Sequence, residues 1–348
     1  MKKVAIIIVN YNGRKYLPEL LGSIFDYGPK TVNQQIIIVD NNSADDSVDF
    51  IKKKYPQVGL LPQAKNVGFA RGNNIGINYA GERGFDYVML LNQDTIITQG
   101  YLDELVSKIE ADNRIAAVQP KLLLYPEKDL INSLGNVIHY LGFGYTCGHR
   151  KKIQDTRYEN QKVNYCSGAA CLIKMEALKK IGLFNDDLFM YHEDLDLGWR
   201  IRMAGFQNII VPEAVVYHQY EFSRSIKKYY YMERNRYIVL FQNYKCGTII
   251  LILPALIVME LGLFMMSFIN GWRQEKIKVY FYFLNPVSWL KILKQRKKIQ
   301  SSRTKKDKEV VGDFSGRIEH QEIDNRLVRL INPLFNLYWQ IVKRLIIW

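Results

Sequence analysis

The stretch FDYVMLLNQD, residues 85–94, decides the fold because it joins an apolar run to an abrupt polar end. Val88–Leu91 is continuously apolar, which is typical of a strand buried on both faces of a parallel sheet. Asn92, Gln93 and Asp94 follow it directly. Open α/β sheets bind ligands at the carboxyl ends of their strands, and a carboxylate there suits a divalent metal that carries phosphate oxygens. The alternative is that Asp94 only begins a turn.

The segments around this stretch alternate between strand and helix patterns. Further strands are expected at residues 4–10, 35–40, 58–61 and 115–124, and helices at 17–25, 43–54, within 65–84 and at 100–110. Right-handed crossovers then give a mostly parallel, Rossmann-like α/β sheet with flanking helices. The spacing G-x-G-x-x-G is absent, which removes most of the support for a nicotinamide enzyme.

Polar residues at three strand ends are expected to meet in space. Parallel neighbouring strands place their carboxyl ends on one edge, so three segments should face one crevice: Asn10–Asn12, Asp40–Asn42 and Asn92–Asp94. Asp40 could accept hydrogen bonds from a base or ribose there, while Lys65 and Arg71 could offset phosphate charge. Each residue also has a structural interpretation, as a turn former or a solvated charge.

A second acidic cluster lies downstream, in FMYHEDLDLGWRIRMAG at residues 189–205. Glu193, Asp194 and Asp196 stand where a helix is expected to begin and gain roughly 0.3 to 1 kcal/mol from its dipole, which is the structural interpretation. The functional interpretation is a general base beside a metal-bound donor, supplied by Asp194 or Glu193.

Composition narrows the class of protein. The 348 residues carry 48 Lys and Arg against 34 Asp and Glu, a formal charge of +14, which points to nucleic acid, a phosphorylated substrate or a membrane surface as partner. The four cysteines have no C-x-x-C spacing and are expected to be reduced thiols. The N-terminal MKKVAIIIVNYNG is interpreted as the first strand and not as a signal peptide.

At this point the chain resembles glycosyltransferase family 2, of the GT-A fold, and within it the rhamnosyltransferase-like branch. The resemblance spans about the first 220 residues and rests on five ordered motifs: VNYNG at 9–13, VDNNS at 39–43, NVGFARGNN at 66–74, LNQDT at 91–95 and the acidic stretch at 189–205. It implies a GT-A catalytic domain over residues 1–225.

The resemblance also implies roles for single residues. In the donor site Asp40 contacts the nucleotide base, and the pocket includes Val9, Tyr11, Asn12, Asn42, Lys65, Arg71 and Asn92. Asp94 matches the metal-binding member of the D-x-D element, whose first position is Asn92 here, and His218 matches a further metal ligand. Alone, a histidine such as His218 is more often structural. Asp194 matches the catalytic base, with Glu193 beside it.

The mechanism that the resemblance implies is inversion by direct displacement, in which Asp194 deprotonates an acceptor hydroxyl and Mg²⁺ or Mn²⁺ neutralises the leaving nucleoside diphosphate. The donor is a nucleotide sugar, dTDP-rhamnose by branch, and the acceptor a lipid-linked glycan or growing polysaccharide of the cell surface or cell wall. One rival is a scaffold of the same fold that has lost catalysis, motivated by Asn92. The other is a nucleotidyltransferase, for which no basic glycine-rich loop is seen.

Residues 226–348 read as a helical, basic, membrane-associated region. The apolar segment 247–270 is long enough to cross a bilayer, but basic flanks on both sides favour a re-entrant or in-plane segment, or a hairpin with Val279–Leu290 as return limb. Residues 326–348 read as an interfacial helix. We expect the protein to lie at the cytoplasmic face of the cell membrane and to have no nucleic acid partner. The sequence is compatible with an oligomer. The alternative is a buried helical subdomain.

Overall fold

The computed structural model describes residues 1–155, 161–220, 226–318 and 326–348. The chain forms two compact units, which we describe one at a time. The first comprises residues 1–136, 146–201 and 206–221, and the second comprises 137–145, 202–205 and 222–348. The fold class expected from the sequence is confirmed, because a mostly parallel α/β sheet is followed by a helical region.

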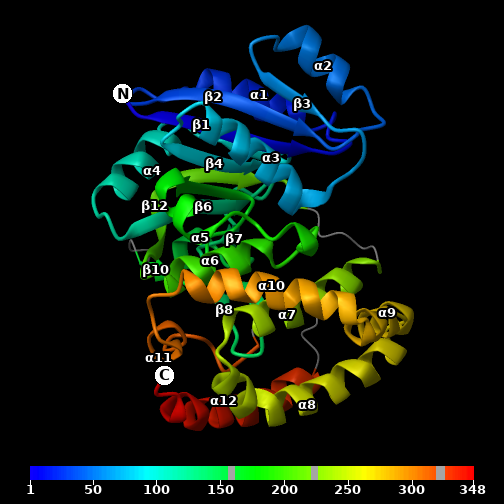
Figure 1. The fold of residues 1–348 in the computed structure, drawn as a ribbon. Coiled ribbons are helices and arrows are strands. Elements are labelled where there is room, and N and C mark those ends of the chain that lie inside the picture. Colours follow the sequence, from blue (N-terminus) through cyan, green and yellow to red (C-terminus); the bar gives the residue numbers. More distant parts are fainter. Residues whose placement is uncertain (156–160, 221–225, 319–325) are drawn as a thin grey trace. The chain divides into compact units, whose positions relative to one another are not determined.

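One ten-stranded sheet runs through the first unit (Figure 1). Its main path has the order β10-β12-β6-β11-β4-β1-β2-β3, while β5 pairs with β12 and β7 with β6. The strands are β1 Lys3–Asn10, β2 Asn33–Asp40, β3 Gly59–Pro62, β4 Tyr87–Asn92, β5 Thr95–Ile97, β6 Ile115–Leu124, β7 Ile131–Ser133, β10 Lys162–Val163, β11 Ala170–Lys174 and β12 Gln207–His218. β1 is parallel to both β2 and β4, and β6 is parallel to β12, whereas β10 and β11 are antiparallel to their neighbours.

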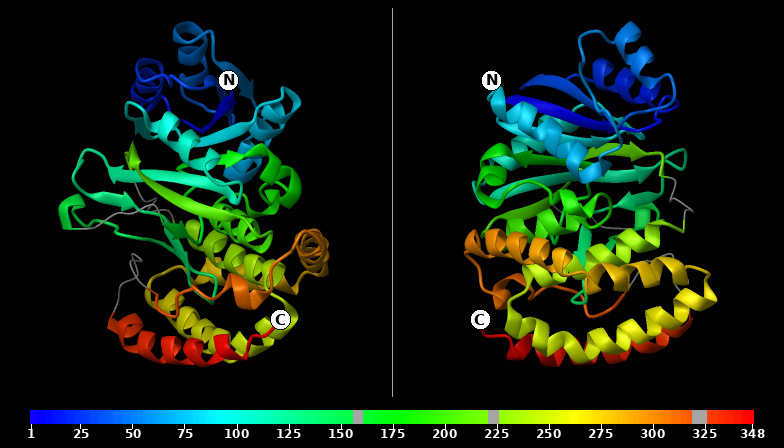
Figure 2. Two further views of the ribbon diagram at one scale, coloured as in Figure 1. Left: turned by 90° about the vertical axis from the view of Figure 1, so that its left-hand side faces the viewer. Right: turned by 45° about the vertical axis from the view of Figure 1, so that its right-hand side comes forward.

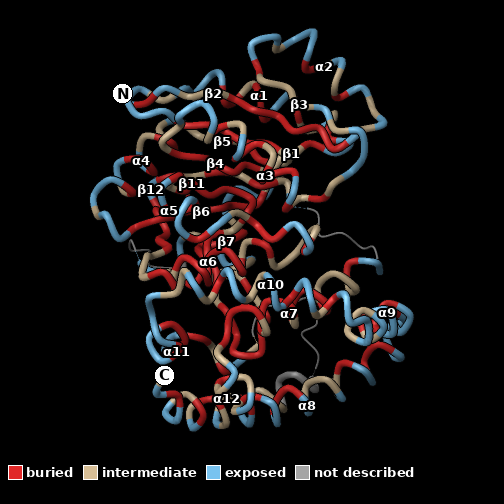
Figure 3. Tube along the Cα trace, viewed as in Figure 1, coloured by how far each residue is buried: buried red, intermediate tan, exposed pale blue. Residues whose placement is uncertain are grey.

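The central strands are buried because helices cover both faces of the sheet. The helices of this unit are α1 Leu17–Asp26, α2 Ser47–Lys54, α3 Gly68–Glu82, α4 Tyr101–Glu110, α5 Met175–Ile181 and α6 Glu193–Met203. Alternate residues of β1 (Val4, Ile6 and Ile8) share one core with the apolar sides of α1 and α4, and Figure 3 shows this interior as the red part of the sheet. The side chain of Ile7 points to the other face, toward α3.

Close packing of α3 on β1 depends on two glycines of that helix. A Cβ atom at Gly72 would lie 2.9 Å from Val9 Cγ1, and one at Gly76 would lie 2.5 Å from Ile7 Cγ2. Both distances are shorter than a van der Waals contact, so any larger residue would push the helix off the strand. Gly72 and Gly76 therefore allow α3 to pack closely on β1.

The second unit is helical and includes most of a two-stranded sheet, β8 Asn136–Ile138 and β9 Gly144–Thr146, whose outer residues Asn136 and Thr146 belong to the first unit. Its helices are α7 Lys228–Asn243, α8 Cys246–Ile269, α9 Arg273–Leu284, α10 Pro286–Ser301, α11 Asp307–Val310 and α12 Arg326–Leu345. The interpretation of Val279–Leu290 as one return limb was wrong, because α9 ends at Leu284 and α10 begins at Pro286. The Asn285 side chain caps the new helix by accepting a hydrogen bond from the Val287 amide.

Candidate active site

The ends of β1 and β2 are tied together by a buried aspartate. Asn10 and Asp40 are register partners, and the Asn10 side-chain amide donates to Asp40 Oδ1 at 2.7 Å. The Ser43 hydroxyl donates to the same oxygen at 2.6 Å, and the Ser43 amide donates to Asp40 Oδ2 at 3.0 Å. Asp40 is 2% exposed. These bonds hold the turn after β2, where Asn42 has a left-handed backbone with φ of 63°.

The turn after β1 is joined to the end of β4 by Gln93. Its side-chain oxygen accepts a hydrogen bond from the Tyr11 amide at 2.8 Å, and Asn12 accepts one from the Ala44 amide at 2.7 Å. A Cβ atom at Gly13 would lie 2.3 Å from Asn10 Oδ1 and 2.5 Å from Gln93 Oε1, so a larger residue there would displace these two side chains. The three strand ends therefore meet at one edge of the sheet, as the sequence predicts.

Asp94 and His218, which lie far apart in sequence, are brought together by the pairing of β5 with β12. Thr95 is the register partner of His218, and this pairing leaves His218 Nε2 3.2 Å from Asp94 Oδ1. His218 is buried and Asp94 is about one fifth exposed. His218 Nδ1 lies 3.0 Å from the side-chain oxygen of Asn132, in β7.

The donor set at this point fits a divalent cation. If His218 Nδ1 carries the proton that the Asn132 oxygen accepts, the lone pair of Nε2 faces the Asp94 carboxylate, and two acceptors this close require a cation or a proton between them. Two ligands of one ion, each about 2.1 Å away and near 90° apart, are roughly 3 Å from each other. Asn92 adds a buried Oδ1 that accepts no hydrogen bond among the described residues. No group of three or more His, Cys, Asp or Glu side chains with metal-binding geometry occurs in the described part of the chain.

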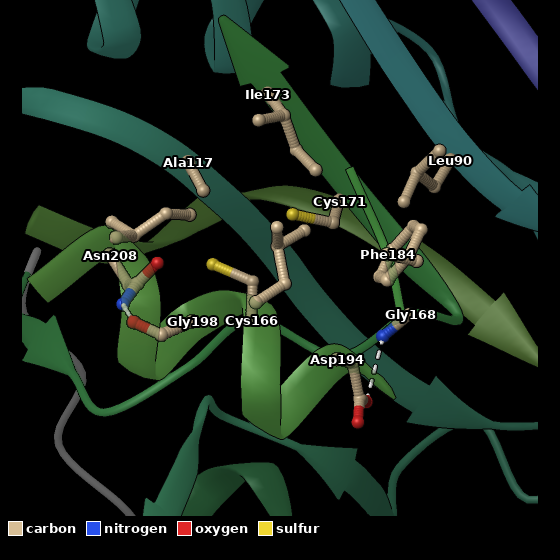
Figure 4. Close-up of a pocket in the computed structure, with 12 residues that line it drawn as sticks. Leu90, Ala117, Cys166, Gly168, Cys171, Ile173, Phe184, Asp194, Gly198 and Asn208 are labelled. Carbon is tan, nitrogen blue, oxygen red and sulfur yellow. Dashed lines mark hydrogen bonds between the residues drawn. The ribbon is translucent and has the colours of Figure 1, made fainter. Parts of the chain in front are cut away.

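Asp194 is fixed at the start of α6 by two backbone amides. Its Oδ2 accepts from Gly168 at 3.1 Å and its Oδ1 from Leu195 at 2.8 Å; Figure 4 shows the first of these bonds. A cavity of about 10 Å³ lies beside this carboxylate, lined among others by Cys166 and Cys171. That volume holds about one water molecule, so the cavity itself is too small for a sugar.

Burial changes the acidity of both carboxyl groups at this helix start. It raises the pKa of Glu193 to about 8, with the neighbouring charge of Asp194 as the next contribution. Burial also raises the pKa of Asp194, against which the Gly168 and Leu195 amides act in the opposite direction. Glu193 Oε2 is buried and has no hydrogen-bond partner among the described residues, which fits a protonated side chain. At neutral pH Glu193 is therefore the neutral member of the pair.

Backbone bonds connect the metal-type site to the acidic helix start. The Asn92 amide donates to Ala169 O at 2.9 Å, and Ala169 follows the glycine that binds Asp194. The segment just before α6 is strained, because Phe189, Tyr191 and His192 all have φ between 63° and 68°. Non-glycine residues in this conformation cost roughly 1 to 3 kcal/mol each and persist at functional sites.

The remaining predicted residues differ in how closely they join this edge. Val9 lies at the end of β1 as the register partner of Asn92 and packs against α3. Lys65 is exposed just before α3, and Arg71 is exposed in the first turn of that helix. Asp196 has a structural role, because its carboxylate forms a fully buried ion pair with Arg200 at 2.9 Å. Arg200 in turn donates to the carbonyl groups of residues 181–183.

Three residues of the site were not predicted from the sequence: Ser43, Asn132 and Gly168. Ser43 stands inside a quoted motif, so its position at a strand end could have identified it. Gln93 was expected at the crevice as part of Asn92–Asp94, and the structure gives it a hydrogen bond to the Tyr11 amide. Asn132 lies in the irregular region 131–162, where no periodic pattern shows which strand it joins. Gly168 stands in the small-residue run SGAA at 167–170, which indicates a turn but no particular role.

A mostly parallel sheet whose carboxyl edge gathers Asp40, the Asp94–His218 pair and a buried helix-start carboxylate defines a glycosyltransferase of the GT-A fold. The comparisons agree. A model described as "Glycosyl transferase family 2" matches residues 5–182, and the chain belongs to that family.

Two relatives illustrate the range of the family. The chain is 28% identical over 233 residues to the N-acetylglucosaminyl-diphospho-decaprenol L-rhamnosyltransferase of Mycobacterium tuberculosis, covering 61% of this chain and 75% of the relative. It is 23% identical over 209 residues to the poly-beta-1,6-N-acetyl-D-glucosamine synthase of Staphylococcus aureus, covering 60% of this chain and 47% of that one.

Solved structures confirm the fold. GalNAc-T7, crystallised with UDP, GalNAc and Mn²⁺, has a TM-score of 0.57 at 17% identity and covers 70% of this chain, which spans about half (48%) of that protein. TarS residues 1–349 of S. aureus has a TM-score of 0.51 at 16% identity and covers 99% of this chain and 90% of its own. At these identities the likeness concerns the fold alone.

Proposed function

We propose that this glycosyltransferase is an inverting enzyme that moves a sugar from a nucleoside-diphosphate donor to a hydroxyl group of a lipid-linked or cell-surface glycan. The observation that carries the proposal is the sheet edge itself. The Asp94–His218 pair at 3.2 Å is joined through the Asn92 and Ala169 backbone to the loop whose Gly168 amide holds Asp194. A cation-type site and a candidate base therefore share one edge.

Asp194 is the proposed general base. Its two amide contacts fix the carboxylate, and burial raises its pKa, so it is a stronger base than an exposed aspartate while it remains ionised. The proton of the acceptor hydroxyl passes to Asp194 as that oxygen attacks the anomeric carbon from the side opposite the leaving diphosphate. Glu193, already protonated at neutral pH, adds no second negative charge beside the base.

Asp94 and His218 would hold a divalent cation, with the Asn92 oxygen as a neutral third donor. Bound Mg²⁺ or Mn²⁺ supplies charge neutralisation to the leaving diphosphate. Asn132 orients the His218 ring through Nδ1. The presence of Mn²⁺ together with UDP in the GalNAc-T7 crystal structure supports this assignment by analogy of fold.

The donor nucleotide is assigned to the edge beside β1 and β2. Asp40 holds the strand ends of that edge together, Val9, Tyr11, Asn12 and Asn42 stand at the ends of β1 and β2 or in the turns after them, and exposed Lys65 and Arg71 are available to phosphate. The relative named as an N-acetylglucosaminyl-diphospho-decaprenol L-rhamnosyltransferase favours rhamnose as the sugar and a polyprenyl-diphosphate-linked acceptor. We propose dTDP-rhamnose as the donor. A lipid-linked acceptor places the enzyme at a membrane, and we propose its cytoplasmic face, where nucleotide sugars are made.

A panel of nucleotide sugars tests the function with the full-length protein. Release of nucleoside diphosphate and thermal stabilisation are measured for dTDP-rhamnose, UDP- and GDP-sugars, with and without Mn²⁺. We expect one donor to stabilise the protein and be slowly hydrolysed, and Asp94→Ala to abolish both metal-dependent effects while Asp49→Asn, at an exposed position, changes neither. Stabilisation without turnover of any donor would favour the inactive scaffold, and release of pyrophosphate would favour a nucleotidyltransferase.

A further inference from the structure

The net positive charge of the chain comes from its last third. Residues 1–221 contain 25 Lys and Arg against 25 Asp and Glu, a formal charge of zero. Residues 222–348 contain 23 Lys and Arg against nine Asp and Glu, so they carry the entire +14. An anionic partner is therefore expected to bind the second unit.

The helix α8 is apolar on its free side as well as on its packed side. Its buried residues form a stripe from the first turn to the last: Thr248, Ile252, Ala255, Leu256, Leu263 and Met266. The opposite side carries Ile250, Leu253, Ile257, Leu261, Met265 and Phe268, each between 47% and 68% exposed. A surface helix of a soluble protein is polar on the side away from the core.

The helix α12 repeats this pattern beside α8. Phe335, Trp339, Val342 and Ile346 are buried, while Leu334, Leu337, Ile341 and Leu345 are 54% to 68% exposed at helical spacing. Tyr338 donates a hydrogen bond to Leu251 O at 2.6 Å, and Trp348 Nε1 donates to Thr248 Oγ1 at 2.9 Å. The two helices lie side by side in all views of Figures 1 and 2. We call their exposed apolar residues the apolar face of the second unit.

Length alone would allow α8 to cross a bilayer. It has 24 residues and extends about 36 Å, and it is the one such candidate among the described residues. Its neighbours argue against a crossing, because Glu260 at mid-helix binds Lys276 of α9 at 2.8 Å, and Lys276 also binds Glu233 of α7 at 2.7 Å. α9 further carries Lys278, whose side chain is 58% exposed. A crossing would bring these charges to membrane depth at a cost of several kcal/mol.

An orientation in the membrane plane keeps these charges out of the bilayer. The apolar face then enters the boundary between headgroups and acyl chains, while the ion pairs of α7 and α9 stay buried within the second unit, outside the acyl chains. Basic residues stand at the borders of the face: Lys245 before α8, Arg273 after it, and Lys343 and Arg344 in the last turn of α12. Between Lys245 and Arg273 the only charged residue is Glu260, which is paired inward.

We propose that α8 and α12 form a monotopic membrane-docking surface, which lies in one leaflet and binds anionic lipid without crossing the bilayer. This proposal rests on the proposed membrane location of the enzyme. It specifies in addition which helices bind the membrane, how they are oriented in it and that the lipid is anionic. The same surface would concentrate the enzyme on the leaflet that holds the acceptor.

Vesicle flotation of the full-length protein tests the docking surface. The probes are vesicles of phosphatidylcholine alone and vesicles with about one third phosphatidylglycerol. We expect binding to both, at least about tenfold tighter to the anionic vesicles. The double variant Leu337→Glu, Ile341→Glu should lose at least tenfold in binding, while Tyr27→Glu, a matched change at an exposed residue of the first unit, should not.

A depth measurement separates docking in the plane from a crossing. Single cysteines at positions 253, 261 and 268, in a chain with Cys147→Ala and Cys246→Ala, carry a fluorophore that nitroxide lipids quench at known depths. We expect all three positions to lie at one shallow depth. A depth maximum at 261, or labelling of 253 and 268 from opposite sides of the bilayer, would overturn the proposal.

Two further outcomes also count against docking. Equal flotation of the double variant and the native chain would show that other residues bind lipid. A stable dimer in lipid-free solution that the double variant dissociates, together with no flotation, would assign the face to a second copy of the chain. Donor stabilisation by nucleotide sugars, measured on the same preparations, reports on the proposed catalytic function independently of either result.

Discussion

Glu193 and Asp194 are neighbours in sequence and carboxylic acids by chemistry, yet the fold gives them different protonation states. Asp194 has two amide donors, whereas one oxygen of Glu193 is buried without a partner in the described structure. We predict that Asp194→Asn lowers kcat by about 10²- to 10⁴-fold, the range of a lost general base, while Glu193→Gln leaves kcat within about threefold. Product release at saturating donor measures both. Equal losses in the two variants would contradict the assignment.

The same difference predicts a pH dependence of stability. The pKa of Glu193 rises from 4.5 to about 8 on folding, so the folded state keeps a proton that the unfolded state loses. Stability is therefore full below about pH 4.5 and falls as pH rises toward 8, with a slope of up to about 1.4 kcal/mol per pH unit. Glu193→Gln removes this loss, so its melting temperature should gain on the native protein between pH 5 and pH 8. A constant difference across that range would refute a protonated Glu193.

Asn132 offers a test of the metal-type site that does not touch a ligand. Its side-chain oxygen lies 3.0 Å from His218 Nδ1, and in the tautomer with the proton on Nδ1 this oxygen accepts it and the lone pair of Nε2 faces Asp94. We predict that Asn132→Ala raises the Mn²⁺ concentration for half-maximal stabilisation and for half-maximal activity by about 10- to 100-fold. At saturating Mn²⁺ most of the rate should return. Asn132→Asp, which keeps the acceptor, should restore tight binding, and a rate loss unaffected by Mn²⁺ would indicate a purely structural role.

At the scale of elements, the register of α3 on β1 is set by glycine. Because a Cβ atom at Gly76 would lie 2.5 Å from Ile7, Gly76→Ala should cost about 1 to 3 kcal/mol through overpacking. Gly22 in α1 is the matched control, since nothing lies within 4 Å of its Cβ position. Gly22→Ala should be neutral or stabilise by up to about 1 kcal/mol. Thermal unfolding in parallel measures both, and equal effects would show that α3 does not depend on this contact.

The elements also show where local patterns stop being informative. The parallel strands and their polar ends follow from apolar runs such as Val88–Leu91, because burial on both faces leaves a continuous signature. The insertion of antiparallel β11 between β4 and β6 has no such signature, since it depends on a pairing between residues about 80 positions apart. The expected return limb Val279–Leu290 contains Pro286, which begins α10, so the segment is divided between two helices.

For the whole molecule, the sequence places the acidic residues of the site on one edge, but only tertiary pairing supplies their partners. His218 reaches Asp94 through the β5–β12 pair, and Asn132 reaches His218 from a region without periodicity. In the C-terminal unit, too, the sequence predicts one property and tertiary contacts decide another. Apolar composition predicts contact with lipid, whereas the choice between crossing and lying in the plane depends on ion pairs such as Glu260–Lys276.

The separation of charge between a neutral first unit and a basic second unit predicts that catalysis and docking can be uncoupled. Leu337→Glu, Ile341→Glu alters side chains that are exposed in water, so donor stabilisation and slow donor hydrolysis should stay within about twofold of the native chain. Transfer to an acceptor embedded in anionic vesicles should fall by about tenfold or more, because the enzyme no longer concentrates on the surface that carries it. Added salt should lower native transfer only in part, since the apolar contribution to docking is not screened. A parallel loss of donor hydrolysis would mean that the second unit supports the catalytic edge directly, and the roles of the two units would then have to be assigned together.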